Sequence, residues 1–296
     1  MKTIVTGSNG CVGKALASMC SQENNWIFID RNSCDLTNRE KTLELFKSIN
    51  PEYVVHLASY VPGFYNISKV ASFNSNIRIN ENVLEASHLA GIERGLFGLS
   101  VNMFGENLDK FPLTESMIME GSLTGPFAGY AYSKRMLALQ CQNYNQQYNR
   151  KYFGIIPCNI YGPYDNFNSG RLIPNLISKF KEAIRNNTDV IINGTGQPLR
   201  QFIYATDLAK IIKYLVVNYQ DDKPIICSSN EETSIADLAF QIGQILNFKN
   251  KIVFDSSKPD GVFKKTVDNS YLKSIMPEIS FTPLKNGLTE TIKYLE

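Results

Sequence analysis

Short apolar runs recur along the first half of the chain, and stretches with helical spacing separate them. The runs are TIVTG (3–7), WIFID (26–30), YVVHLAS (53–59), GLFGLS (95–100) and YFGIIPCNIYG (152–162). Residues 41–49 and 79–90 have the three- and four-residue spacing of helices. Continuous rather than alternating apolar strands are typical of a parallel sheet that is covered on both faces. With right-handed crossovers, the pattern predicts a doubly wound α/β fold.

After about residue 163 the alternation of predicted strands and helices ends. Loops with proline and glycine lead to predicted helices near 172–185 and 207–219, with the sequence VIINGTGQPLRQFIY between them. The change predicts a second, smaller α/β lobe for the substrate. The expected domains are 1–163 plus 202–228, which would bind the cofactor, and 164–201 plus 229–296, which would form the substrate lobe.

Composition describes a globular, enzyme-sized chain of 296 residues, 43% hydrophobic and 20% charged. A net charge of +2 without a basic stripe argues against nucleic acid or a membrane surface as the main partner. The six cysteines form no CxxC pair, which favours reduced thiols over disulfides or zinc. The chain enters a strand pattern at once and has no apolar run of about 18 residues, so we expect a cytoplasmic protein.

A glycine-rich segment, VTGSNGCVGKAL, joins the first predicted strand to a helix. Its glycines, Gly7, Gly10 and Gly13, have GxxGxxG spacing, which permits a tight turn and brings backbone N–H groups close to a pyrophosphate. Because the motif begins at residue 7 of a βαβ chain, it predicts a Rossmann-type dinucleotide site rather than a turn without a ligand.

The choice between NAD and NADP stays open at the end of the second predicted strand. There, Asp30 would accept a hydrogen bond from a free ribose 2′-hydroxyl, whereas Arg31 would pair with a 2′-phosphate. Asp35 would accept from the adenine amine or, equally well, cap a helix.

Tyr130 and Lys134, in GYAYSKRM, are four residues apart and share one face of a predicted helix, whereas Tyr132 does not. A phenol has a pKa near ~10, so proton exchange near neutrality needs a cation that stabilises the phenolate, and a lysine one turn away supplies it. The spacing alone is weak evidence. Together with the glycine loop and the turn LSVNMFG, which carries Ser100, it predicts a catalytic site.

These motifs resemble the extended short-chain dehydrogenases/reductases. NIYGPYDNFNSGRLIPNLISKF, GTGQPLRQFIYATDLA and KPDGVFKKTVDNSYL further resemble the GDP-L-fucose synthase family, so the likeness covers essentially the whole chain. The resemblance implies NADP(H), with NAD(H) as the alternative, and a GDP-linked 4-keto-6-deoxy sugar used in deoxysugar and polysaccharide biosynthesis. It also implies that Tyr130 protonates the C4 oxygen, that Lys134 holds the nicotinamide ribose and that Ser100 hydrogen-bonds the carbonyl.

The resemblance implies further binding residues and a homodimer formed through the Tyr130 helix and the helix before it. For the cofactor these are Gly7, Asn9, Gly10, Val12, Gly13, Asp30, Arg31, Asp35, Leu36, Leu57, Ala58, Lys134, Pro157 and Ile160. For the substrate they are Asn102, Asn159, Arg171, Lys179, Arg200 and Lys265. Asn193 stands where a tryptophan is expected, which leaves the identity of the base an inference. No metal site is expected.

Two positions depart from the family pattern. The family epimerises C3 and C5 with a cysteine and a histidine, which here correspond to Asn102 and Arg171. A carboxamide has no useful proton affinity, and a guanidinium keeps its proton in proteins. We expect His56 to pack beside the cofactor strand and Cys158 to be a strand residue. The sequence therefore predicts a C4 ketoreductase of a hexose or heptose without epimerase activity.

Three other readings remain open. A bifunctional synthase would use unconventional acids, such as a water held by Asn102, or Tyr60. A non-catalytic regulatory protein would use the fold only to bind the cofactor. A dehydratase is disfavoured because Val101 follows Ser100 and the turn supplies no carboxylate pair.

Overall fold

The computed structural model describes residues 1–61, 68–167 and 169–295. Its centre is a six-stranded sheet in the order β10-β5-β4-β3-β1-β2, in which every neighbouring pair is parallel. The strands are β1 (Thr3–Thr6), β2 (Trp26–Ile29), β3 (Tyr53–His56), β4 (Arg94–Gly98), β5 (Lys151–Pro157) and β10 (Ile225–Cys227). This arrangement confirms the predicted doubly wound, Rossmann-type sheet.

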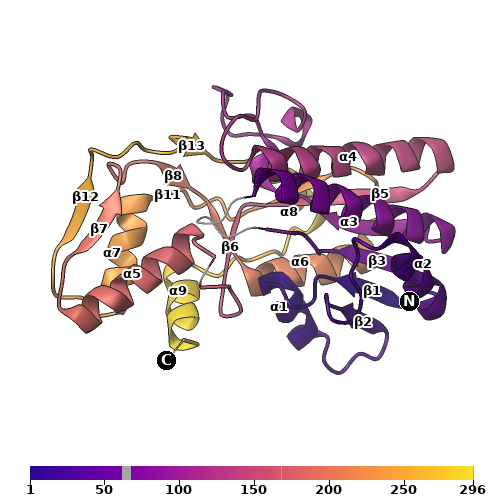
Figure 1. The fold of residues 1–296 in the computed structure, drawn as a ribbon, viewed down its shortest axis with the longest axis horizontal. Helices are drawn as coiled ribbons and strands as arrows, with labels where there is room; N and C mark the ends of the chain where they lie inside the picture. The colour runs from indigo at the N-terminus through magenta and orange to yellow at the C-terminus, as the bar shows by residue number, and fades with distance from the viewer. Residues whose placement is uncertain (62–67, 168, 296) are drawn as a thin grey trace.

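Helices cover both faces of this sheet (Figure 1). On one face α3 and α4 pack on each other with α2 beside α3, and on the other face α1 packs on α6. Their bounds are α1 (Cys11–Met19), α2 (Arg39–Ile49), α3 (Lys69–Leu89), α4 (Ala128–Tyr148) and α6 (Ala205–Asn218). Two short 3₁₀ turns, η2 (Val101–Met103) and η3 (Glu115–Met117), lie between β4 and α4.

The remaining elements form a smaller unit beside the sheet, except for α8 (Ser270–Ile275), which packs against β10 of the sheet (Figure 1). They pair as β12 with β7, β8 with β11 and β13, and β6 with β9. The strands are β6 (Asn159–Tyr161), β7 (Val190–Asn193), β8 (Leu199–Arg200), β9 (Phe202–Tyr204), β11 (Thr233–Ser234), β12 (Ile252–Asp255) and β13 (Lys264–Lys265). The helices are α5 (Leu172–Asn186), α7 (Ile235–Ile245) and α9 (Leu284–Lys293).

Two hydrophobic clusters underlie these units. The larger one surrounds the six-stranded sheet, and the smaller one lies among α5, α7 and α9. Val267 and Leu272, which the sequence assigns to the substrate lobe, are buried in the larger cluster. The predicted domain boundaries stay a prediction, and these two residues mark where the lobe's chain returns to the sheet.

Two predicted elements differ from the structure. Helix α3 begins at Lys69, ten residues before the apolar pattern at 79, because its first turns bury hydrogen-bonded polar residues such as Asn76 instead of apolar ones. The apolar run at 152–162 is not one strand. It divides at Cys158, after which β6 leaves the sheet to pair with β9.

The strand order brings the predicted motifs to one edge of the sheet. Strand β1 lies between β2 and β3, so the chain crosses to opposite sides of β1, and ligands bind at the carboxyl ends of strands at such a reversal. The glycine loop follows β1, residues 57–61 follow β3, and Ser100 follows β4.

Among the described residues, no helix has the length and apolar character needed to span a membrane. All six cysteines are free, and five of them are buried.

Candidate active site

The glycine loop packs tightly against the strand ends. Gly7 has a φ of +78°, and a Cβ there would lie 2.6 Å from the Ala58 backbone nitrogen. A Cβ on Gly13 would lie 2.3 Å from the Gly7 carbonyl oxygen. Gly10 is the N-cap of α1, whose first turn has no side-chain cap and no acidic residue. Within the described residues, the N-terminus of α1 therefore presents N–H groups without a side-chain cap, as an anion site requires.

The carboxylate of Asp30 is already engaged by its neighbours. Its Oδ2 accepts from Asn9 Nδ2 at 2.6 Å, and its Oδ1 accepts from the Ser33 backbone N and Oγ, both at 2.9 Å. Arg31 beside it is exposed. Asp30 is therefore engaged by its neighbours, whereas the exposed Arg31 makes no hydrogen bond or ion pair within the described residues.

Asp35 is not a helix cap. Its Oδ1 accepts from Thr37 N and Oγ1 at 3.1 and 2.8 Å, whereas Asn38 caps α2. The predicted apolar cofactor contacts lie near the ends of the sheet strands: Val12, Leu36 and Pro157 are buried, and Leu57, Ala58 and Ile160 are partly buried.

Tyr130 and Lys134 lie one turn apart near the start of α4, as the spacing predicts. Nζ of Lys134 lies 5.7 Å from the centroid of the Tyr130 ring and donates a 2.6 Å hydrogen bond to the Gly98 carbonyl at the end of β4. The lysine is only 3% exposed, and burial lowers its pKa from 10.5 to about 8. Helix and sheet thus fix the ammonium beside the phenol.

Ser100 joins this pair. Its Oγ accepts from the Asn102 backbone N at 3.2 Å, which leaves the hydroxyl hydrogen available for another acceptor. Burial raises the pKa of Tyr130 above its ordinary value, while hydrogen bonding from Ser100, the charge of Arg171 and hydrogen bonding from Ser59 act in the opposite direction. A phenol in this environment is protonated near neutrality and is suited to donate a proton.

A series of hydrogen-bonded, buried polar side chains, which was not predicted, connects the elements that carry the site. His56 Nε2 donates to Asn80 Oδ1 at 3.2 Å, because the amide nitrogen of Asn80 already donates to the Ser133 carbonyl. Thr6 Oγ1 then donates to His56 Nδ1 at 2.7 Å. Burial lowers the pKa of His56 to about 3, so the ring is neutral and ties β1 and β3 to α3 and α4. The four-residue spacing of Asn76 and Asn80 is the signal that could have revealed this face.

Arg135 holds the turn that follows Ser100. This buried guanidinium donates to the carbonyls of Met103, Gly121 and Glu120 at 2.7, 2.9 and 2.5 Å. The sequence around Arg135 does not predict this role, because the carbonyls that it binds lie 14 to 32 residues away in the chain.

Arg171 is the N-cap of α5 and forms an ion pair with Asp165, a buried residue that was not predicted. The positive charge of Arg171 acts on Cys11 in the glycine loop as well as on Tyr130, so it lies between the predicted cofactor and catalytic residues. Burial raises the pKa of the Cys11 thiol to about 11 and that of Cys158 to about 12. Neither thiol is poised as an acid–base group near neutrality.

Of the other predicted substrate residues, three lie together and two make separate contacts. Lys265 donates to Asn102 Oδ1 at 3.4 Å and lies opposite Arg200 in the β13–β8 pair, so these three residues are brought together. Asn159 donates to the Gln201 carbonyl at 2.8 Å. Lys179 instead donates to the Ile191 carbonyl in β7 at 2.9 Å.

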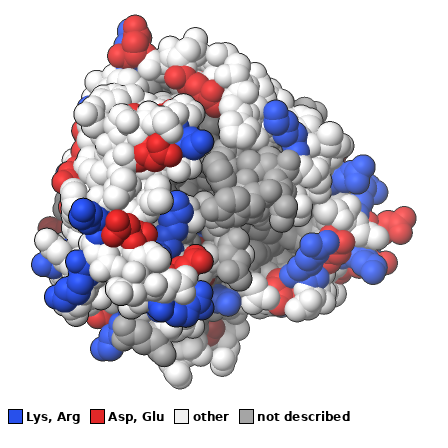
Figure 2. Space-filling model, turned by 60° about the vertical axis from the view of Figure 1, so that its left-hand side comes forward, with Lys and Arg blue, Asp and Glu red and all other residues white. Residues whose placement is uncertain are grey.

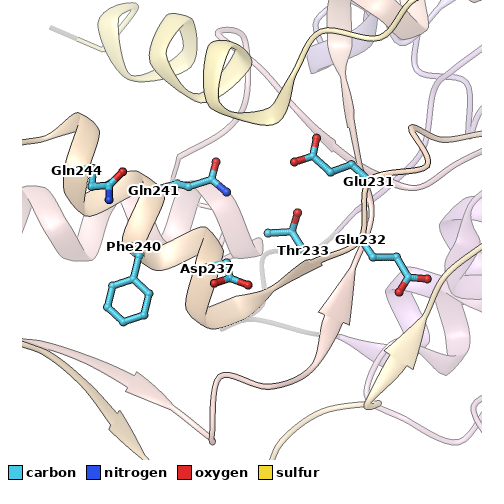
Figure 3. Close-up of a pocket in the computed structure, with 7 residues that line it drawn as sticks. All are labelled: Glu231, Glu232, Thr233, Asp237, Phe240, Gln241 and Gln244. Atoms are coloured by element: carbon cyan, nitrogen blue, oxygen red, sulfur yellow. The ribbon is translucent and has the colours of Figure 1, made fainter.

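A surface groove of about 350 Å³ lies elsewhere, between residues 231–233 and α7 (Figure 3). Glu231, Glu232 and Asp237 line it, so it would repel a dinucleotide or a diphosphate.

Over the face shown in Figure 2, acidic and basic side chains are interspersed.

The glycine loop, the Tyr130–Lys134 pair and Ser100 all lie within a part of the chain that a known protein family matches. The model of the NAD dependent epimerase/dehydratase family matches residues 3–227. The chain belongs to this family. The expected enzyme class and the recognition of an extended short-chain dehydrogenase/reductase are confirmed.

Within the family, the chain is 40% identical to the GDP-L-fucose synthase of Dictyostelium discoideum over 98% of this chain and 94% of that protein. Its structure is similar to an NADP-bound GDP-L-fucose synthetase from Naegleria fowleri, with a TM-score of 0.92, 33% identity and coverage of 99% and 93%. It is also similar to a GDP-6-OMe-4-keto-L-xylo-heptose reductase from C. jejuni, with a TM-score of 0.90, 26% identity and coverage of 99% and 97%.

Proposed function

We propose that the protein is an NADPH-dependent C4 ketoreductase of a GDP-linked 4-keto-6-deoxy sugar, a hexose or a heptose, without C3/C5 epimerase activity. The observation that carries the proposal is the constellation of Ser100, Tyr130 and Lys134 beside Asn102 and Arg171. The first three supply what ketone reduction needs. The last two stand where the family's proton carriers are expected.

The residues of the glycine loop fit a dinucleotide. The uncapped start of α1 would receive the pyrophosphate, and two of the three N–H groups of the Lys134 ammonium are unpartnered within the described parts of the chain and would reach a ribose. Because Asp30 is engaged and Arg31 is exposed, the 2′-phosphate of NADP is favoured over the free hydroxyl of NAD. When bound, the cofactor would supply the hydride to C4.

Side chains of the protein would donate a hydrogen bond and a proton to the carbonyl oxygen at C4. Ser100 donates its hydroxyl hydrogen to this oxygen, and Tyr130 protonates it as negative charge develops there. The fixed Lys134 ammonium stabilises the tyrosine after proton transfer. Preorganisation matters here because the donors need no rearrangement during the reaction.

Epimerisation would require a proton to leave and return at C3 or C5. Asn102 has no titratable group near neutrality, and Arg171 is held as a cation by Asp165. His56 is neutral, buried and fully engaged. Asn76 binds the backbone N and carbonyl of Tyr60, whose side chain is exposed. The bifunctional alternative therefore depends on the Tyr60 phenol or on a water held by Asn102, and its test is the stereochemistry of the product.

The experiment is turnover of purified protein with GDP-4-keto-6-deoxymannose and NADPH, followed at the nicotinamide absorbance band, with the product assigned by NMR. The proposal expects NADPH consumption and a product reduced at C4 with C3 and C5 unchanged. Tyr130→Phe is the matched control. An absence of NADPH consumption would favour a regulatory protein, or a dehydratase, whose overall reaction consumes no NADPH.

The active form would be a homodimer in which α3 and α4 of two copies pack together. Support comes from apolar side chains that these helices leave exposed, including Val70 at 71% and Leu139 at 39%. Light scattering coupled to size exclusion tests it, with the mass of a dimer expected. The mass of a monomer would overturn this part of the proposal.

A further inference from the structure

Asn102 and Lys265 connect the turn that carries Ser100 to the smaller unit. Nζ of Lys265, in β13, donates to Asn102 Oδ1 at 3.4 Å, across 163 residues of sequence. The Asn102 side chain is exposed, and its backbone N donates to Ser100 Oγ. Asn102 therefore adjoins, through its backbone, the hydroxyl that we assign to the substrate carbonyl, and its side chain is exposed beside Lys265.

The orientation of the Asn102 amide follows from its partner. An ammonium group only donates hydrogen bonds, so the atom that faces Lys265 is the amide oxygen. The amide nitrogen then has two N–H hydrogens that meet no acceptor within the described residues. Asn102 thus has a side-chain donor available for a ligand of the site.

Lys265 is held in place on both sides. In the β13–β8 pair it lies opposite Arg200. Immediately after it, the Thr266 carbonyl accepts from the Leu113 backbone N at 2.9 Å, and the Asp268 backbone N donates to the Leu113 carbonyl at 2.8 Å. The backbone that follows Lys265 is thus anchored to the segment that leads from β4 to α4.

We propose that Asn102 is a specificity-determining residue that donates a hydrogen bond to an oxygen substituent on the carbon next to the ketone carbon, and that Lys265 is its positioning residue. This inference rests on the proposed function. In a 4-keto-6-deoxy sugar, C5 carries the ring oxygen and the C6 carbon, so the exocyclic oxygen beside the ketone is the C3 hydroxyl. The enzyme then selects 3-hydroxy over 3-deoxy substrates.

The test compares kcat/KM for GDP-4-keto-6-deoxymannose and its 3-deoxy counterpart. The native protein is expected to prefer the hydroxylated compound by about tenfold, the usual effect of one lost hydrogen bond that leaves a donor unpaired. In Asn102→Ala the ratio falls to near one, through loss of activity on the hydroxylated compound alone. A native ratio near one, or an unchanged ratio in the variant, overturns the inference.

Two lysine variants separate positioning from general effects. Lys264→Met is the matched control: Lys264 is adjacent in β13 but pairs with Glu232 at 3.2 Å, so the variant keeps the native ratio. Lys265→Met lowers kcat/KM for both compounds and also reduces the ratio, because the amide loses its fixed orientation. A ratio that survives in Lys265→Met overturns the positioning role.

Failure of the proposed function can be distinguished from failure of the specificity inference. If neither compound is reduced, the reductase proposal fails, and calorimetric binding of the two compounds to the native protein and to Asn102→Ala decides the inference by the ratio of Kd values. Because the Asn102 side chain is exposed and the bond to Ser100 uses its backbone N, the variant is expected to fold, which thermal unfolding checks.

Discussion

Replacement of Lys134 by Met is expected to abolish catalysis and yet stabilise the protein in the absence of cofactor. Lys134 is 3% exposed, and burial lowers its pKa from 10.5 to about 8. The unfolded chain therefore binds the proton more tightly than the folded protein does. Because each factor of ten in proton affinity corresponds to about 1.4 kcal/mol, the buried charge costs about 3 kcal/mol of unfolding free energy.

The free-energy cost of burying the Lys134 charge decreases as the pH rises. It is fully present below pH 8, where both states are protonated, and it disappears above 10.5, where both are neutral. Between pH 6.5 and 9.5 the stability advantage of Lys134→Met over the native protein should fall by about 2 kcal/mol. Loss of the hydrogen bond to the Gly98 carbonyl subtracts about 1 kcal/mol at both pH values and leaves this difference unchanged.

Urea unfolding at the two pH values measures the effect. Lys264→Met serves as the control, because a partly exposed ion pair contributes at most about 1 kcal/mol and little of it varies over this range. A Lys134→Met variant that is less stable than the native protein at pH 6.5, by an amount that does not change with pH, would refute the argument from burial.

Further predictions concern the other residues of the site. Tyr130→Phe and Ser100→Ala should each lower kcat at least about a hundredfold in steady-state turnover, while cofactor affinity in a binding titration stays the same. Gly13→Ala would place a Cβ 2.3 Å from the Gly7 carbonyl, so it should lower Tm and remove the thermal shift that the cofactor induces; an unchanged shift would contradict cofactor binding at the glycine loop. Arg171→Met removes a charge that lowers the pKa of Tyr130, so the loss of kcat at high pH, where the phenol has given up its proton, should move to higher pH. A pH profile identical to that of the native protein would exclude this role of Arg171.

The parts of the molecule that depend on local pattern were predictable from the sequence. Strands β1 to β4 lie on the first four apolar runs and β5 on the first part of the fifth, because a strand buried on both faces is largely apolar. The spacing of Tyr130 and Lys134 predicted their shared helix face. The glycines were predictable because the turn after β1 requires a positive φ at Gly7.

Other features depend on partners far away in the chain, which no local pattern marks. The first turns of α3 are polar because Asn76 and Asn80 bind backbone and side chains of other elements. The side chain of Asn102 is bound by Lys265, 163 residues away. This pair forms only when the smaller unit folds against the edge of the sheet.

The central claim, reduction without epimerisation, is tested most directly by turnover of GDP-4-keto-6-deoxymannose with NADPH in deuterated water, with a reaction lacking enzyme as the blank. We predict that NMR of the product finds no deuterium above the blank at C3 or C5, because neither Asn102 nor Arg171 exchanges a proton with the sugar. The double variant Asn102→Cys with Arg171→His is the positive control. Enzyme-dependent deuterium at C3 or C5 in the native product would contradict the claim.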